Sequence, residues 1–377
     1  MTIHIHINFE PIGRRGESPA GRSLLECARQ LGVDLVSLCG GWGSCGRCKV
    51  QIVSGRISDL TSQEHEALTP EEIAQGYRLA CCAIPLSDCL VYVPPESLTA
   101  PQRTQVEGLD VAVSVEPPAR AYAVQLAAPS LEHGDLRGDA DRLLDALDPQ
   151  QSVRGYALDI ELLRALSLHL RSYDWRANVV VRDAHENGRE LVALLPPTAR
   201  PLGLAVDLGT TKIAAYLVDL ETGQTLASEG FMNPQITYGE DVVARITFVN
   251  EDASRAALLQ DVLAQALNRA AAEMCARVGA APDQIVESVV VGNTAMHHLF
   301  AGLPVEQLAR APYVPAVASA LDVKARNLGL RVAPGSYVHL LPNIAGYVGA
   351  DHVAMLLATG MAQREDVALA IDIGTNT

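Results

Sequence analysis

The placement of the cysteines constrains this chain more than any other feature, because seven of the eight stand before residue 90. Three lie in LCGGWGSCGRCKV with the spacing C-x5-C-x2-C, and a fourth follows in RLACC. Thiolates that converge from one loop on a metal centre require a backbone that turns repeatedly, and glycine reaches positive φ angles without steric cost. The glycine-rich loop therefore predicts a metal site. Its candidate ligands are Cys39, Cys45, Cys48 and Cys81, and its glycines are Gly40, Gly41, Gly43 and Gly46.

The residue pattern alone leaves the metal and the fourth ligand open. Zinc also binds four cysteines, although zinc ribbons usually bring two CxxC pairs and this segment has one. Cys82 competes with Cys81 for the fourth position, because the side chains of neighbouring residues point in different directions. The remaining cysteines, Cys27, Cys89 and Cys275, are expected to be small buried residues.

Charge and the opening segment exclude several functional classes. The formal net charge of −15 opposes binding to nucleic-acid phosphates and to anionic membrane surfaces. The opening residues MTIHIHINFE alternate like a strand and lack the apolar run of a signal peptide. We therefore expect a cytoplasmic protein with no nucleic-acid or membrane partner. In that reducing compartment, metal binding is favoured over disulfide formation.

The first 95 residues resemble the plant-type and adrenodoxin-type [2Fe-2S] ferredoxins in glycine pattern, ligand spacing and the motif Leu-Ala-Cys. The resemblance implies a β-grasp ferredoxin domain over 1–95 that carries a [2Fe-2S] cluster. It also implies that Cys39, Cys45, Cys48 and Cys81 are the ligands, with Cys81 preferred to Cys82 because it completes Leu-Ala-Cys. Within this unit a helix is expected over LTPEEIAQGYRLA.

The rest of the chain divides into three parts. The polar stretch PPESLTAPQRTQVEGLD has no helical or strand period and indicates a linker over 96–111. Residues 112–200 alternate strand and helix patterns and predict a small α+β middle domain without a recognisable chemical motif. Residues 201–377 contain apolar strands, a long Ala/Leu helix and a last apolar strand, VALAIDIGTNT. The expected fold class is therefore an α/β multidomain protein.

Two near copies of one motif, DLGTT at 207 and DIGTN at 372, form the most informative long-range pattern. Each follows an apolar strand, so the chain turns tightly there and presents N–H groups and hydroxyls. Such a turn suits a phosphate, and its aspartate suits hydrated Mg²⁺. One copy would be weak support for a nucleotide site, whereas two copies separated by a full α/β lobe are strong. The candidate residues are Asp207, Gly209, Thr210, Thr211, Asp372, Gly374 and Thr375.

The paired motifs resemble the two phosphate loops of the actin, sugar kinase and heat-shock ATPase superfamily. The segments between them narrow the resemblance to the reductive activators of corrinoid proteins; these segments are MNPQITYGEDVVARI, VVVGNTAMHHLF, APYVP and LPNIAGYVGAD. The resemblance implies ATP-dependent reduction of Co(II) to Co(I) through the cluster, with Asp207 and Asp372 placing Mg²⁺ and the attacking water. It also implies a low-potential electron donor, and a corrinoid protein or a corrinoid-dependent methyltransferase system as partner. A homodimer is compatible with it.

The sequence ends at Thr377, inside the second motif, whereas the resemblance implies a whole second lobe beyond that point. We therefore expect a C-terminally truncated chain, with the first lobe of the actin-like fold and the start of the second over 201–377. The alternative is a non-enzymatic [2Fe-2S] electron carrier or redox sensor whose actin-like module binds nucleotide or a partner. A small-molecule kinase is disfavoured, because it has no use for a cluster.

Two polar pairs are expected to be structural. His297 and His298 are neighbours on a predicted helix and diverge by about 100 degrees, so they do not chelate one ion together. Asn293 and Thr294 follow a strand that ends at Gly292, and Asn293 is expected to cap the next helix rather than to contact a nucleotide.

Overall fold

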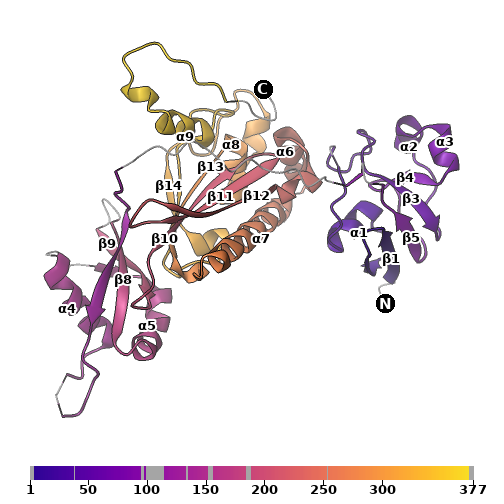
Figure 1. Ribbon diagram of the computed structural model, residues 1–377. Helices are drawn as coiled ribbons and strands as arrows, with labels where there is room; N and C mark the ends of the chain where they lie inside the picture. Colours follow the sequence, from indigo (N-terminus) through magenta and orange to yellow (C-terminus); the bar gives the residue numbers. More distant parts are fainter. Residues whose placement is uncertain are drawn as a thin grey trace.

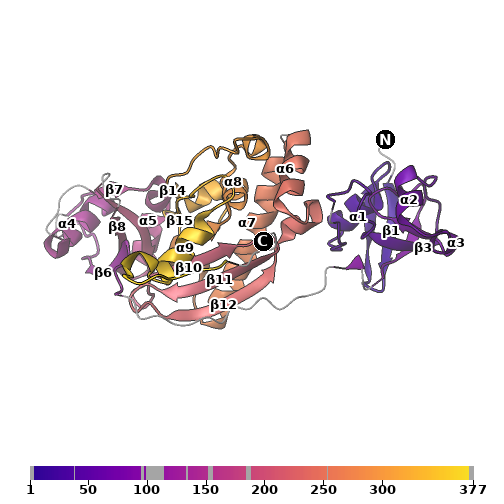
Figure 2. The same cartoon turned by 90° about the horizontal axis from the view of Figure 1, so that it is seen from above.

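The computed structural model describes residues 4–37, 39–94, 97–98, 114–132, 135–151, 156–183, 188–252 and 254–372. They form three sheets that each carry helices, which confirms a mixed α/β multidomain chain (Figure 1). The strand orders are β2-β1-β5-β3-β4, β12-β11-β10-β13-β15-β14 and β6-β8-β9-β7. Both views place the six-stranded sheet in the centre, with the other two units at opposite ends (Figure 1, Figure 2).

The N-terminal unit is the five-stranded sheet with its helices. Ile5, Ile7 and Phe9 alternate along β1 and are all buried, because every second side chain of a strand faces the same side. Helix α1 packs against this core and begins at a capping box formed by Ser23 and Glu26. The elements of this unit are β1 (His4–Glu10), β2 (Arg14–Pro19), α1 (Leu24–Gln30), β3 (Lys49–Ser54), α2 (Ser62–Ala67), α3 (Pro70–Ala74), β4 (Tyr77–Leu79) and β5 (Cys89–Tyr92).

The helix expected over LTPEEIAQGYRLA is shorter than predicted. Helix α3 ends at Ala74, Gly76 adopts a φ of +83°, and Tyr77–Leu79 forms β4 against β3. Glycine takes this left-handed conformation without strain, and the apolar residues after it are buried in the sheet. The consequence is a strand that leads directly to Cys81.

The four-stranded unit packs helices on one face of its sheet and the central unit on the other. On β8, Val179 faces the helices, whereas the adjacent Val180 joins a small core with Val286 of β13. Arg182 adds a buried ion pair with Glu287, in which its Nε donates to Oε2 at 2.7 Å. This unit is thereby fixed to the central sheet. Its elements are β6 (Ala119–Gln125), α4 (Asp139–Gln151), β7 (Tyr156–Leu158), α5 (Ile160–Ser172), β8 (Arg176–Asp183) and β9 (Arg189–Leu195).

The central sheet has three parallel strands in its middle, since β13 runs parallel to both β10 and β15. The carboxyl ends of parallel strands meet at one edge, and the register places Leu208 of β10 opposite Gly292 of β13 there. Helix α7 packs Leu259, Leu263 and Leu267 into the core of this unit. The strands are β10 (Leu202–Leu208), β11 (Lys212–Asp219), β12 (Thr225–Met232), β13 (Ile285–Gly292), β14 (Leu321–Lys324) and β15 (Tyr337–Leu340). The α-helices are α6 (Val242–Glu251), α7 (Ser254–Arg277), α8 (Thr294–Ala301) and α9 (Ala350–Ala358), and the 3-10 helices are η3 (Pro234–Tyr238), η4 (Pro282–Gln284), η5 (Glu306–Ala309), η6 (Ala325–Leu328) and η7 (Met361–Gln363).

The last apolar strand predicted from VALAIDIGTNT does not form in the part of this segment that the structure describes, up to Asp372. Val367, Leu369 and Ile371 are exposed, and no described strand pairs with them. A strand needs a neighbour that satisfies its backbone N–H and C=O groups, so an apolar pattern alone does not produce one. Across the described ranges, no helix is both long enough and apolar enough to cross a membrane.

Candidate functional site

The cysteine loop brings two of the predicted ligands into direct contact. The sulfurs of Cys48, which precedes β3, and Cys81, which follows β4, are 3.4 Å apart. Two thiolates bound ~2.3 Å from one tetrahedral metal lie about 3.7 Å from each other, so this pair fits a single metal atom. Their hydrogen bond lowers the pKa of Cys48 and raises that of Cys81. Cys39 and Cys45 lie in the same loop and are both half-buried, and hydrogen bonding between their side chains lowers the pKa of Cys39 and raises that of Cys45.

The glycines of this loop are required both for conformation and for space. At Gly40 an added Cβ would lie 2.9 Å from the carbonyl oxygen of Tyr238, which belongs to the central unit. At Gly43 it would lie 2.9 Å from the sulfur of Cys82. Backbone and neighbours thus exclude larger residues at these two positions. The φ angles are +70° at Gly40, +107° at Gly41, +77° at Gly43 and +65° at Gly46, as the sequence predicts.

The geometry favours Cys81 over Cys82 as the fourth ligand. The Cys82 sulfur is 3.7 Å from that of Cys81, yet among the described residues it is Cys81 that reaches Cys48. The cysteines expected to be structural are indeed buried; they are Cys27, Cys89 and Cys275. Burial raises the pKa of Cys89 and of Cys275 to about 11, which keeps both as thiols at neutral pH.

A buried ion pair positions β4, the strand that leads to Cys81. Arg78 Nε donates to Glu64 Oε1 at 2.8 Å, Nη2 donates to Oε2 at 3.0 Å, and the backbone N–H of Leu79 donates to Oε1 at 3.1 Å. Glu64 is fully buried and also completes the capping box of α2 with Thr61. Sequence analysis missed this pair, although the capping pattern Thr-x-x-Glu marks the glutamate.

The turn between β10 and β11 is held by side chains from three other segments. Asn233 Nδ2 donates to the carbonyl oxygen of Gly209 at 2.8 Å, and Asn293 Nδ2 donates to Thr210 Oγ1 at 2.9 Å. The buried Arg245 donates from Nη2 to the carbonyl oxygen of Thr210. The shape of the turn is therefore set by its surroundings before any ligand binds.

Carboxylates gather at the same edge of the sheet. His352 Nε2 is 3.5 Å from Asp372 Oδ2, and one possible ligand atom from each of Asp351, His352 and Asp372 lies within 4.8 Å of the others. Asp207 reaches solvent, but the surrounding protein raises its pKa to about 6, and the charges of Asp351 and Asp372 add to that effect. Oxygen ligands of this kind could hold a divalent cation.

The structure thus brings Asp372 near Asp207, as the repeated motif implies, while Gly374 and Thr375 lie outside the described residues. Sequence analysis missed Asp351 and His352. No sequence motif marks these two residues, and they are identified only by their place in the fold, in the first turn of α9 after β15.

Asn293 caps the next helix as predicted, and the ring nitrogens of His298 are bonded within the fold. The Asn293 side chain caps α8 by accepting from the N–H of Met296 at 3.0 Å, in addition to its bond with Thr210. His298 has one ring nitrogen 2.7 Å from the carbonyl oxygen of Thr294, and its other ring nitrogen accepts from the N–H of Ala316. Both nitrogens are engaged, so His298 does not join His297 on one ion.

One short segment contacts both candidate sites. We call residues 233–239 the bridging segment: it contains η3, and Asn233 begins it with N–H donation to the carbonyl oxygen of Thr211 at 2.9 Å. Near its other end, the Arg29 guanidinium of α1 lies over the ring of Tyr238, 4.4 Å from its centre, and Gly40 approaches the Tyr238 carbonyl. A chain of contacts therefore links the cysteine loop to the turn after β10.

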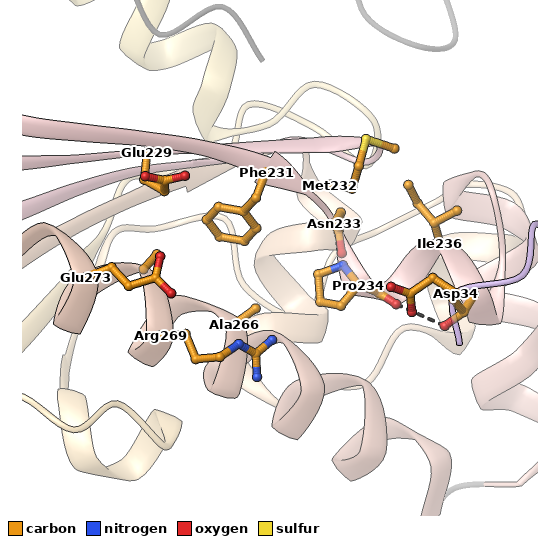
Figure 3. Close-up of a pocket in the computed structure, with 12 residues that line it drawn as sticks. Asp34, Glu229, Phe231, Met232, Asn233, Pro234, Ile236, Ala266, Arg269 and Glu273 are labelled. Atoms are coloured by element: carbon orange, nitrogen blue, oxygen red, sulfur yellow. Dashed lines mark hydrogen bonds between the residues drawn. The ribbon is translucent and has the colours of Figure 1, made fainter. Parts of the chain in front are cut away.

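A cavity of about 350 Å³ lies beside the bridging segment (Figure 3). Asp34 of the N-terminal unit stands close to Pro234 at one end, and Arg269 and Glu273 of α7 line the other side. Burial raises the pKa of Asp34, although the charge of Arg269 opposes that effect. The contact between the N-terminal and central units therefore includes charged residues and encloses this cavity.

Comparison with known families assigns three consecutive regions. The model of the 2Fe-2S iron-sulfur cluster binding domain matches residues 7–86, that of the RACo linker region matches 108–200, and that of the RACo middle region matches 202–364. The chain therefore carries a [2Fe-2S] cluster binding domain, and the sulfur pair of Cys48 and Cys81 suits such a group.

Two corrinoid-related proteins match nearly the whole chain, and a reductase component matches about a third of it. The corrinoid activation enzyme RamQ of Eubacterium limosum is 26% identical over 358 residues, which are 93% of this chain and 54% of RamQ. A solved structure of a reductive activator for corrinoid, iron-sulfur protein aligns with a TM-score of 0.58 and 30% identity, over 96% of this chain and 59% of its own. The reductase component DmpP of a phenol 2-monooxygenase from Pseudomonas sp. (strain CF600) is 32% identical over 128 residues, or 33% of this chain and 36% of DmpP. This chain spans little more than half the length of the two corrinoid-related proteins.

Proposed function

Because the chain belongs to the RACo family through its ferredoxin, linker and middle regions, we propose that it acts in the ATP-dependent reduction of a corrinoid protein from Co(II) to Co(I). The corrinoid centre would lie on a corrinoid protein or in a corrinoid-dependent methyltransferase system. The electron would come from a low-potential donor. RamQ and the reductive activator of known structure, both named for corrinoid activation, support this reading.

Within this proposal, Cys39, Cys45, Cys48 and Cys81 hold the [2Fe-2S] cluster, which supplies one-electron transfer when bound. The 3.4 Å approach of Cys48 and Cys81 supports this ligand set. Arg78 and Glu64 fix the backbone that immediately precedes Cys81.

The nucleotide would bind at the carboxyl edge of the central sheet, as the first lobe of an actin-like ATPase fold. Gly209, Thr210 and Thr211 would present the turn after β10 to the phosphates, with Gly374 and Thr375 doing the same in the second copy of the motif. Asp207 and Asp372 would place Mg²⁺ and the attacking water. The convergence of Asp207, Asp351 and Asp372 supports a cation here, because a divalent ion would offset the desolvation and the neighbouring charges that raise the pKa of Asp207.

The bridging segment is the observation that carries the combined function. Its Asn233 bonds to the turn after β10, and its Tyr238 meets the cysteine loop at Gly40. Arg245 strengthens the link, because its Nε donates to the carbonyl oxygen of Gly239 at 2.9 Å while Nη2 donates to that of Thr210. A ligand that moves the turn would therefore also move the surface on which the cysteine loop rests.

A link between the nucleotide site and the cluster would allow ATP binding to offset the cost of an uphill electron transfer. A one-electron transfer that is uphill by ~59 mV costs about 1.4 kcal/mol, and a ligand that binds two conformations unequally can offset several such steps. ATP would do this by favouring the arrangement of the two units in which the electron reaches the corrinoid.

The proposal is tested by mixing the whole protein with a Co(II) corrinoid protein and a low-potential reductant, with and without ATP. Co(I) absorbance should appear only with ATP, and phosphate release should rise when the corrinoid protein is added. Co(I) formation at the same rate and extent without ATP would contradict the proposal. That result would favour the alternative, a non-enzymatic electron carrier or redox sensor whose actin-like module binds nucleotide or a partner.

A further inference from the structure

Arg29 is a cation held in an unusual position at the contact between the N-terminal and central units. It lies near the end of α1, and its Nε and Nη2 are buried without a hydrogen-bond partner among the described residues. Burial lowers the pKa of this guanidinium. A buried charge is normally paired, because its desolvation is costly when nothing compensates it. The charge of Arg29 therefore calls for a nearby anion.

The residues on the same helix do not supply that anion. Glu26 lies one turn earlier but is exposed, and its carboxylate accepts from the N–H and hydroxyl of Ser23 in the capping box. In the part of the chain that the structure describes, Arg29 forms no ion pair with a carboxylate. Its face toward the central unit is covered by the uncharged ring of Tyr238 at 4.4 Å.

The helix that carries Arg29 lies beside the segment that carries a sulfur ligand, because the backbone N–H of Leu25 donates to the carbonyl oxygen of Ala80 at 2.8 Å. The groups whose negative charge would favour the charged guanidinium are Tyr238, Glu26, Cys48 and Cys81. Cys48 and Cys81 are the pair separated by 3.4 Å, and both pack in the same core cluster as the buried residues of α1. As metal-bound thiolates they would be the permanent negative charges that face Arg29.

We propose that Arg29 is a positioning residue for electron transfer: it stabilises the reduced [2Fe-2S] centre, and the ring of Tyr238 holds it in place for this task. Two ferric ions, two sulfides and four thiolates together form an anion, and one electron from a low-potential donor makes that anion more negative by one unit. The same electron leaves to the acceptor, and no bond forms or breaks. A nearby, half-buried cation favours the reduced state and raises the reduction potential.

Because Tyr238 belongs to the bridging segment, the inference also deepens the proposed function, on which it rests. The segment that positions Arg29 bonds through Asn233 to the turn after β10. Movement of that turn on nucleotide binding would change how firmly Tyr238 covers the guanidinium. The contact between the two units would thus set the reduction potential of the centre.

Redox titration of the purified protein, followed by visible absorbance and by the electron paramagnetic resonance signal of the reduced cluster, tests the inference. Arg29→Gln should reduce the equilibrium constant for one-electron reduction at least tenfold, which is ~59 mV toward more negative potential. Arg29→Lys should restore most of this loss, because it keeps the charge. Arg15→Gln, which removes an exposed charge on β2, should leave the potential unchanged.

A second variant keeps the inference open to refutation if Arg29→Gln fails to retain a cluster. Tyr238→Leu preserves Arg29 but removes the ring above it, and it should shift the potential in the same direction by a smaller amount. An unchanged potential in either variant with the cluster spectrum intact would overturn the role of Arg29 and leave the proposed function standing. A wild-type protein without a [2Fe-2S] spectrum would overturn both, whereas failure to form Co(I) with these shifts present would overturn only the corrinoid proposal.

Discussion

The cysteine loop and the carboxyl edge of the central sheet reach a binding arrangement by opposite means. In the cysteine loop, backbone conformation sets the positions of the sulfurs. Gly40 and Gly43 have positive φ and no space for a side chain, and the sulfurs of Cys48 and Cys81 lie 3.4 Å apart. At the carboxyl edge, the surrounding protein disfavours the charge of Asp207 and raises its pKa, and the nearby charges of Asp351 and Asp372 raise it further. The first site therefore has the shape of the group it would bind, whereas the second holds a carboxylate whose charge its surroundings disfavour, and a bound cation would offset that cost.

The largest effect is expected from the ligands of the shaped site. Cys45→Ser or Cys48→Ser should abolish the visible absorbance and the paramagnetic signal of the reduced [2Fe-2S] centre, because each removes one thiolate from the set of four. The matched control is Cys275→Ser, whose sulfur is buried in the core of the central unit. Cys82→Ser should likewise keep the spectrum. If Cys82→Ser bleached the protein and Cys81→Ser did not, the fourth ligand would be Cys82.

The next largest effect is expected from the buried ion pair of Arg78 and Glu64, which holds the strand before Cys81. Glu64→Gln leaves the Arg78 guanidinium without its charged partner, and breaking a buried pair in this way costs about 3–5 kcal/mol. Urea titration of cluster absorbance should show this loss, while the exposed Glu71→Gln should change the free energy of unfolding by less than ~0.5 kcal/mol. Equal midpoints for the two variants would mean that the pair does not support the loop.

The same pair predicts a pH dependence. Burial alone would raise the pKa of Glu64, but hydrogen bonds from Arg78, Thr61 and Leu79 reverse this and lower it below the ordinary value of 4.5. A carboxyl with a lowered pKa in the folded state contributes stability that is present above 4.5 and is lost as the pH falls through the folded value. The stability of the wild type relative to Glu64→Gln should therefore shrink in acid. A difference that stayed constant from pH 7 down to pH ~3 would contradict this assignment.

Asp207 at the carboxyl edge should show a smaller dependence of stability on pH, with the opposite sign to that of Glu64. The pKa of Asp207 is raised to about 6 by burial and by Asp351 and Asp372, so the folded state binds this proton more tightly than the unfolded state does. Stability then falls as the pH rises from 3.8 toward about 6 and stays lower above that range. Asp207→Asn should therefore stabilise the protein at pH 7.5 by about 1 kcal/mol, a value reduced for the solvent around this carboxyl.

Calorimetric melting at several pH values measures this difference, which should vanish near pH 4. Millimolar Mg²⁺ should stabilise the wild type and not Asp207→Asn, because the ion binds the folded carboxylates. A less stable Asp207→Asn at pH 7.5 without Mg²⁺ would show that the carboxylates are not under repulsion.

The two sites also differ in how far the sequence could predict them. The spacing of Cys45, Cys48 and Cys81 and the glycines between them state a local geometry, so the loop was predictable from nearby residues. The partners that reach across units were not: the contact of Arg29 with Tyr238 joins residues far apart in the chain. Asp351 joined the carboxylates for the same reason, because only the fold brings α9 to that edge.

The errors of prediction have related causes. Periodicity suggested one helix through Gly76, but burial in the sheet made Tyr77–Leu79 a strand. The alternating residues Val367, Leu369 and Ile371 predicted a strand, yet a strand depends on a neighbour, and none of the described strands pairs with them. Local pattern is a sufficient guide only where the partner is local too.

The most direct test of the link between the two sites is a paired measurement of Co(I) absorbance and phosphate release in the whole protein. Asp207→Ala should leave the cluster reducible by a chemical donor and abolish Co(I) formation, because it removes the carboxylate proposed to hold Mg²⁺ and spares the cysteine ligands. Cys45→Ser should keep the release of phosphate that the corrinoid protein stimulates and end electron delivery through the cluster. If Asp207→Ala still produced Co(I) at the wild-type rate and extent, ATP would not drive the reduction, and the protein would be an electron carrier rather than an ATP-dependent activator.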